Sequence, residues 1–147
     1  MKKITNSIAV LIIGVVLFSA YYRNSEKREV KRRLGEYLYS IHVGNKEIDK
    51  RLTKKAQTIC NSFGGEGRKV RVKYDLEPLS KGWNAYTTQL YDGTYLIVTS
   101  TESEKTLYHE VAHVITFEEA AIHGPSWKMV MTKMGYPKEA ARYKNNF

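Results

Sequence analysis

The chain has 147 residues, of which 27% are charged and 42% are hydrophobic. This length allows one domain with a short accessory segment, and this composition excludes a chain that is disordered throughout. The single cysteine, Cys60, excludes an internal disulfide, and its surroundings predict a small apolar residue on a helix.

Most of the net charge of +9 lies near the N-terminus. Residues 1–33 hold eight basic and two acidic side chains, a net charge of +6 around one apolar stretch. This distribution favours a membrane surface over a nucleic-acid-binding stripe. The apolar stretch, residues 8–22, contains no charged side chain and reaches a marginal membrane-spanning length if it begins at residue 4.

The stretch therefore predicts a single-pass membrane anchor, with a cleaved signal peptide and a buried core helix as alternatives. Six basic residues follow it within a short distance, which favours a soluble domain on the cytoplasmic side of a membrane. Secretion after signal cleavage is the alternative location. The predicted organisation is an N-terminal membrane anchor or signal segment with a basic flank (1–33), followed by one soluble domain (34–147).

Periodicity and turn residues then predict the elements of the soluble part. Helices are expected over residues 34–40 and 46–63, the second of which ends at two glycines, and residues 69–74 alternate as in a half-buried strand. Residues 83–90 and 94–100 flank Asp92-Gly93, a strong signal for a hairpin. The continuous apolar run at 95–98 marks the second hairpin strand as the better buried.

Helices are predicted for the rest of the chain. Thr101 and Glu104 fit a capping box at the start of a helix, and Pro125 and Pro137 suit the first turns of two more. The apolar face of the first of these helices comprises Leu107, Val111, Val114 and Ile115, and that of the second comprises Trp127, Val130, Met131 and Met134. Together with the strands, this order predicts an α+β domain with a small antiparallel sheet.

The first of these helices carries the motif His109-Glu110-Val111-Ala112-His113. Two histidines four residues apart project from one helix face, so both imidazoles can reach one metal ion. Glu110 stands where it can take a proton from a metal-activated water. The motif therefore predicts a hydrolytic zinc site with one Zn²⁺ ion.

The third ligand is predicted to be His123, which precedes Gly124 and Pro125. On a straight helix it would lie about 15 Å from His113, so the chain has to reverse between residues 118 and 122. No glycine or proline lies there to force the reversal, and Glu118 and Glu119 are rival ligands. His42 has no ligand spacing and is expected to be an ordinary surface or packing residue.

The HExxH string, the His123-Gly124-Pro125-Ser126-Trp127 element and an apolar helix ending at Gly135 resemble the SprT-like zinc metallopeptidase family over roughly residues 84–137. The resemblance implies a minimal zincin-like fold, zinc held by His109, His113 and His123, and Glu110 as the catalytic base. It also implies that an edge strand within residues 84–90 aligns an extended peptide. The family includes a protease of DNA–protein crosslink repair, so nucleic acid is a possible further partner.

The predicted function is a zinc-dependent metallopeptidase acting on a protein or peptide, whose N-terminal segment contacts a membrane. Tyr136, Arg142 and Tyr143 are candidate donors to the developing oxyanion. A non-catalytic zinc-binding module and a membrane-associated interaction protein are the alternatives. The sequence predicts neither the substrate nor the oligomeric state.

Overall fold

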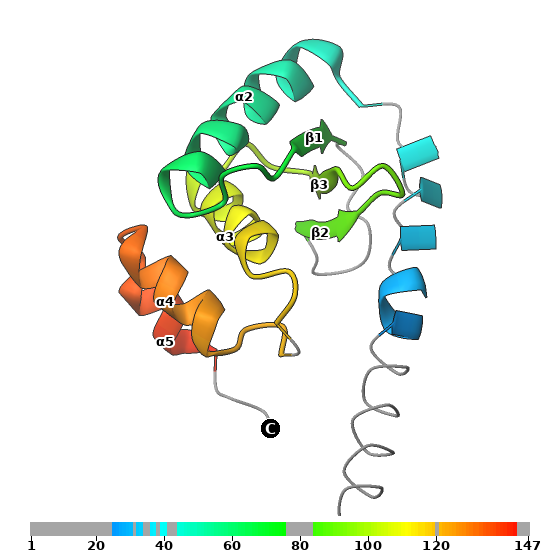
Figure 1. The fold of residues 1–147 in the computed structure, drawn as a ribbon. Helices are drawn as coiled ribbons and strands as arrows, with labels where there is room; N and C mark the ends of the chain where they lie inside the picture. The colour runs from blue at the N-terminus through cyan, green and yellow to red at the C-terminus, as the bar shows by residue number, and fades with distance from the viewer. Residues whose placement is uncertain are drawn as a thin grey trace, which may run out of the picture.

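A computed structural model of the chain describes residues 25–30, 32–33, 36–37, 39–40, 44–75, 84–119 and 121–143. Its elements are α2 (Lys46–Ser62), β1 (Val70–Tyr74), β2 (Ala85–Gln89), β3 (Tyr95–Thr99), α3 (Glu104–Ile115), α4 (Pro125–Lys133) and α5 (Pro137–Arg142). The predicted α+β class is confirmed, and each of these elements lies within a residue or two of its predicted bounds (Figure 1).

The three strands form a mixed sheet in the order β1-β3-β2. The predicted hairpin is present, since β2 pairs antiparallel with β3, but β1 pairs with β3 in parallel. The expectation of an antiparallel sheet was therefore wrong. Residue alternation in β1 determines which side chains face the core, but it does not specify the direction of the neighbouring strand.

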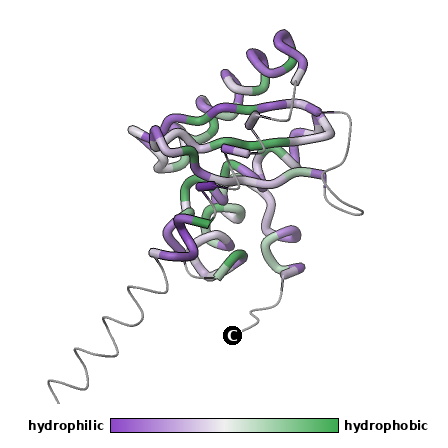
Figure 2. The backbone as a smooth tube through the Cα atoms, turned by 90° about the vertical axis from the view of Figure 1, so that its right-hand side faces the viewer, coloured by the Kyte–Doolittle hydropathy of each residue, from purple (hydrophilic) through white to green (hydrophobic). Residues whose placement is uncertain are grey.

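The central strand β3 is buried along its whole length, as its apolar run predicted. Its two faces contribute to different hydrophobic clusters: Ile97 packs in the main core with α2, α3 and α4, whereas Leu96 and Val98 pack with Tyr39 and Tyr86 on the other face. Figure 2 shows hydrophobic stretches running through the strands in the middle of the molecule. A strand that is buried on both faces suits the centre of a sheet.

Helix α2 closes the outer edge of β1 with its side chains. Asp49 accepts a hydrogen bond from the backbone N–H of Tyr74 (2.6 Å), and Thr53 accepts one from that of Val72 (2.9 Å). One helical turn further on, Gln57 accepts from the N–H of Val70 (2.9 Å) and donates to the carbonyl of Arg68. Side chains four residues apart on the helix thus satisfy alternate amides of the strand.

The other edge of the sheet is β2. At the two ends of this strand, the N–H of Leu90 donates to the carbonyl of Thr94, and the N–H of Ser100 donates to the carbonyl of Asn84. Because bonded pairs alternate along an antiparallel ladder, Tyr86 and Thr88 are the residues between them that bond to β3. In an antiparallel ladder the intervening residues, Ala85, Thr87 and Gln89, direct their backbone groups away from β3. Since α2 closes β1, β2 is the edge that presents a backbone ladder outward in the part of the sheet that the structure describes.

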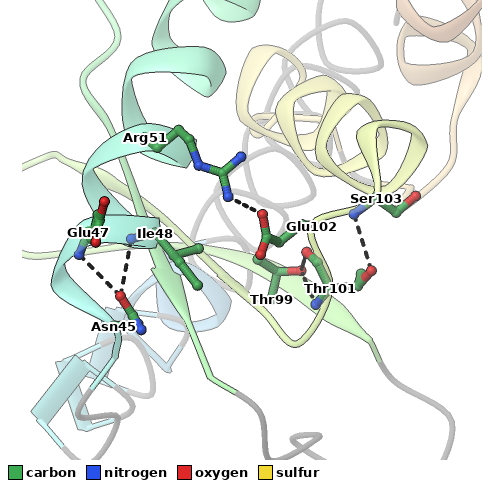
Figure 3. A network of polar contacts seen from close by, with 8 residues as sticks. All are labelled: Asn45, Glu47, Ile48, Arg51, Thr99, Thr101, Glu102 and Ser103. Atoms are coloured by element: carbon green, nitrogen blue, oxygen red, sulfur yellow. Dashed lines mark hydrogen bonds and ion pairs between the residues drawn. The ribbon is translucent and has the colours of Figure 1, made fainter.

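The motif helix begins two residues later than the predicted capping box. Ser103, rather than Thr101, is the N-cap of α3, and its side chain accepts from the N–H of Thr106. The Thr101 hydroxyl instead accepts a hydrogen bond from the N–H of Ser103, just before the helix begins (Figure 3). Next to this turn, Arg51 of α2 forms an ion pair with Glu102, which ties the start of α3 to α2 (Figure 3).

The prediction of a single-pass membrane location is wrong for the described part of the chain, in which no helix is long and apolar enough to cross a membrane. The apolar stretch 8–22, on which the predicted N-terminal hydrophobic helix rested, lies outside the described residues. Part of the basic flank contacts the folded body: Arg28 pairs with Glu118 (3.4 Å), and Arg32 donates to Gln89 of β2 (3.4 Å).

Candidate metal centre

His109 and His113 lie one turn apart on the same face of α3, as the spacing predicts. Their Nε2 atoms are 3.2 Å apart. The helix is held in place by Leu107, Val111 and Val114, which are buried in the main core. The two imidazoles therefore project from a helix that packs firmly against α2, α4 and β2.

His123 joins them from the loop before α4. Its Nε2 atom lies 3.2 Å from that of His109, and the ligand atoms of all three histidines lie within 4.8 Å of one another. The reversal that this requires starts at Thr116, where α3 ends, and includes a turn in which the N–H of Glu119 donates to the carbonyl of Thr116 (2.8 Å). The chain thus turns back without glycine or proline in the turn itself.

The spacing of the three nitrogens fits a tetrahedral metal ion. With Zn–N bonds of 2.0–2.1 Å, two nitrogens on a tetrahedral zinc are about 3.3 Å apart. The two observed separations of 3.2 Å match this value. The three residues could therefore hold one metal ion, and a fourth tetrahedral position would remain for a water molecule.

Burial keeps two of these imidazoles neutral. It lowers the pKa of His109 to about 4, with a smaller contribution from the charge of His123. Burial is also the largest cause of the lowered pKa of His123. Neutral imidazole is the form that binds a metal, so His109 and His123 are in the form that can bind a cation near pH 7.

Two aromatic rings enclose the histidines. The buried indole of Trp127 contacts all three rings, with centroids 4.8 Å from His109, 5.5 Å from His113 and 4.4 Å from His123. Its Nε1 also donates to the carbonyl of His109 (3.4 Å). Tyr143, just after α5, stacks on His123 with centroids 3.8 Å apart. These contacts restrict how the imidazoles can rotate.

Glu110 points from α3 toward β2. Its side chain is buried, and its Oε2 accepts a hydrogen bond of 2.7 Å from the Thr87 hydroxyl, which also lies 3.1 Å from the Glu110 carbonyl oxygen. Burial raises the pKa of Glu110 to about 7, and the hydrogen bond from Thr87 acts in the opposite direction. A cation held by the imidazoles would also lower the pKa of Glu110, as the hydrogen bond from Thr87 does.

The two alternative third ligands, Glu118 and Glu119, make other contacts. Glu118 is half-exposed and pairs with Arg28, while both carboxylate oxygens of Glu119 accept hydrogen bonds from the first turn of α4. Cys60 is buried in the core, as expected, and His42 lies outside the described residues. Within the described part of the chain, His109, His113 and His123 form the only group of three potential ligands that converge.

Of the candidate oxyanion donors, Tyr143 lies at the histidines, whereas Tyr136 packs against Tyr108 at the other side of α3 (centroids 5.2 Å apart). Arg142 is exposed. The roles of Thr87 and Glu119 were not predicted from the sequence. Thr87 carries a weak signal, because it is a threonine on the core-facing side of the edge strand that precedes the motif.

Comparison with known proteins gives one match. Residues 84–145 match the model of the SprT-like family, a segment that contains β2, β3, α3, α4 and α5. No curated protein and no solved structure matches the chain significantly. The segment includes the three histidines, Glu110 and the strand that contacts it. Over residues 84–145, the chain is therefore similar to the SprT-like family.

Proposed function

We propose that the protein is a zinc-dependent metallopeptidase. The observation that carries the proposal is the convergence of three imidazoles, at separations that fit a tetrahedral ion, beside a buried glutamate on the helix that holds two of them. The match of residues 84–145 to the SprT-like family supports a metallopeptidase-like domain. A histidine triad that leaves one coordination position open is typical of catalytic zinc rather than structural zinc.

In this mechanism His109, His113 and His123 would hold Zn²⁺, which would supply an activated water and polarise the scissile carbonyl. Glu110 would accept the proton of the water whose oxygen attacks the carbonyl carbon. It would then donate the proton to the departing amine as the C–N bond breaks. The hydrogen bond from Thr87 orients the Glu110 carboxylate.

The substrate is an extended segment of a protein or peptide. Ala85, Thr87 and Gln89 direct their backbone groups outward from the edge strand β2, where a peptide can add as a further strand. Because Thr87 contacts Glu110, a peptide that pairs with β2 passes close to the proposed general base. Backbone pairing of this kind favours unfolded or extended substrates over a particular side-chain sequence.

Tyr143 is the candidate for stabilising the oxyanion. It is the predicted donor that lies against His123 and His109, with ring centroids 3.8 and 5.6 Å away. Burial raises its pKa, so its hydroxyl stays protonated and can donate a hydrogen bond near pH 7.

The test is the Glu110→Gln variant, compared with wild type for zinc content and for cleavage of an unfolded protein with and without a chelator. Loss of the general base should lower kcat by about 10²- to 10⁴-fold while one zinc per chain is retained. Glu66→Gln, at an exposed position in the turn after α2, is the matched control and should cleave as wild type does. Full activity in Glu110→Gln would exclude the assigned base.

A further inference from the structure

The least constrained part of the metal centre is the segment that brings His123 back to α3. His109 and His113 lie on one packed helix, whereas His123 lies in the loop between α3 and α4. Its position relative to the other two histidines therefore depends on what fixes the start of α4.

A carboxylate from this same loop fixes that start. Glu119 Oε1 accepts a hydrogen bond from the N–H of Ser126 (2.9 Å), and its Oε2 accepts one from the N–H of Trp127 (3.1 Å). These are the second and third residues of α4, whose N–H groups have no partner within the helix. The N-cap, Gly124, has no side chain to satisfy them.

The Glu119 carboxylate therefore takes the place of an N-cap side chain as the hydrogen-bond acceptor for the first turn of α4. It satisfies two amides at once, and its negative charge lies at the positive end of the α4 dipole. His123 is held between the two ends of this contact, since the chain runs from Glu119 through His123 to Ser126. Trp127, whose amide is one of the donors, also packs its ring against all three imidazoles.

Gly124 leaves the space that the contact needs. Its φ of −73° and ψ of −174° are open to any residue, so backbone strain does not require glycine at this position. A Cβ atom at residue 124 would instead collide with the Glu119 carboxylate. The buried glycine and the carboxylate are thus complementary parts of one arrangement.

We infer that Glu119 is a positioning residue for the metal centre, which holds His123 at the distance required for a third ligand by anchoring α4. This inference rests on the proposed zinc site and adds to it the residue that fixes the third imidazole. The ligand atoms that converge belong to the three histidines, and the Glu119 carboxylate binds the amides of α4 instead, so Glu119 acts through His123.

The experiment measures zinc affinity by competition with a coloured chelator, so it does not depend on peptidase activity. Glu119→Gln replaces one accepting oxygen with a donor and removes the charge, so zinc should bind about tenfold to hundredfold more weakly. Gly124→Ala should weaken zinc binding to a similar extent by displacing the carboxylate. Glu118→Gln, a neighbouring exposed glutamate that pairs with Arg28, is the matched control and should bind zinc as wild type does.

A His123→Ala background separates positioning from general destabilisation. If Glu119 acts through His123, Glu119→Gln should change zinc affinity less than about twofold once His123 is absent. Hydrogen exchange at the amides of Ser126 and Trp127 in the zinc-free protein provides a second readout, and it should become faster in Glu119→Gln.

Two results would overturn the inference: wild-type zinc affinity in Glu119→Gln, or an equal loss of affinity with and without His123. If the variants change zinc affinity as expected but the protein cleaves no peptide, the peptidase proposal is overturned and the role of Glu119 is not.

Discussion

Thr87 connects the edge strand to the proposed general base through a single hydroxyl. Its Oγ1 lies 2.7 Å from Glu110 Oε2, and the carboxylate is buried, so no bulk water is at hand to replace this hydrogen bond. A hydrogen bond to a charged group contributes about 1.5–3 kcal/mol. We expect Thr87→Val, which keeps the shape of the side chain, to lower kcat by about tenfold.

In the same variant, zinc affinity and KM should stay near their wild-type values, because the hydroxyl contacts neither a histidine nor the outward backbone of β2. Thr87→Ser should restore kcat, and Thr58→Val on the exposed side of α2 should leave it unchanged. Steady-state kinetics and chelator competition measure these quantities. A Thr87→Val enzyme with wild-type kcat would show that Glu110 is oriented by something else.

That the candidate metal ligands lie close together could be predicted from the sequence, whereas the contacts that orient the candidate site residues could not. His109, Glu110 and His113 follow from helical spacing, which is local in the chain. Glu119 was considered only as a rival ligand, because its partners are backbone amides of a helix that begins after the reversal. Thr87 lies 23 residues before Glu110, and no local pattern brings the two together.

At the scale of elements, the contact between α2 and the edge of β1 makes a separate prediction. Thr53 both accepts from the N–H of Val72 and approaches its carbonyl oxygen, in a half-buried position. Removing the hydroxyl leaves a strand amide without its partner, which costs about 1–3 kcal/mol. We expect Thr53→Val to lower the free energy of unfolding by this amount, as measured by urea denaturation.

Zinc affinity in Thr53→Val should be unchanged, because the three histidines proposed to bind zinc lie on α3 and in the loop before α4. Thr58→Val, on the same helix but exposed, should alter stability by less than about 0.5 kcal/mol. Equal losses of stability in the two variants would mean that the Thr53 hydroxyl contributes nothing to closing the edge of β1.

The outward ladder of β2 leads to a prediction about substrates. In a strand paired with β2, only alternate residues direct their N–H groups toward it. We expect N-methylation along a cleaved peptide to raise KM at every second residue and to have little effect at the residues between. A scan with no alternation would show that the peptide is not bound as an added strand.

The elements themselves could be predicted from local patterns, but their pairing could not. The alternating residues of β1 and the Asp92-Gly93 turn led to strand assignments that lie within a residue or two of those observed. The parallel pairing of β1 with β3 depends on the path of the chain between β1 and β2, which the side-chain pattern does not encode. The N-cap of α3 was misplaced because Thr101 and Ser103 both suit a helix start, and the observed helix begins after Ser103.

At the scale of the whole molecule, α2 and β1 lie at one edge of the sheet (Figure 1), and the three converging histidines lie on α3 and in the loop before α4. The SprT-like match covers residues 84–145. Residues 28 and 32 of the basic flank contact this matched segment, through Glu118 and Gln89. The contact of Thr87 with Glu110 links β2 to the helix that carries His109 and His113.

The most direct test of the account is zinc X-ray absorption, together with metal analysis, on the purified chain. We predict one zinc per chain, bound by three imidazole nitrogens and one further light atom at about 2.0–2.1 Å. Replacing His123 with alanine should remove one imidazole from the spectrum. A chain without stoichiometric zinc, or a sulfur ligand at about 2.3 Å that would implicate Cys60, would contradict the proposed site.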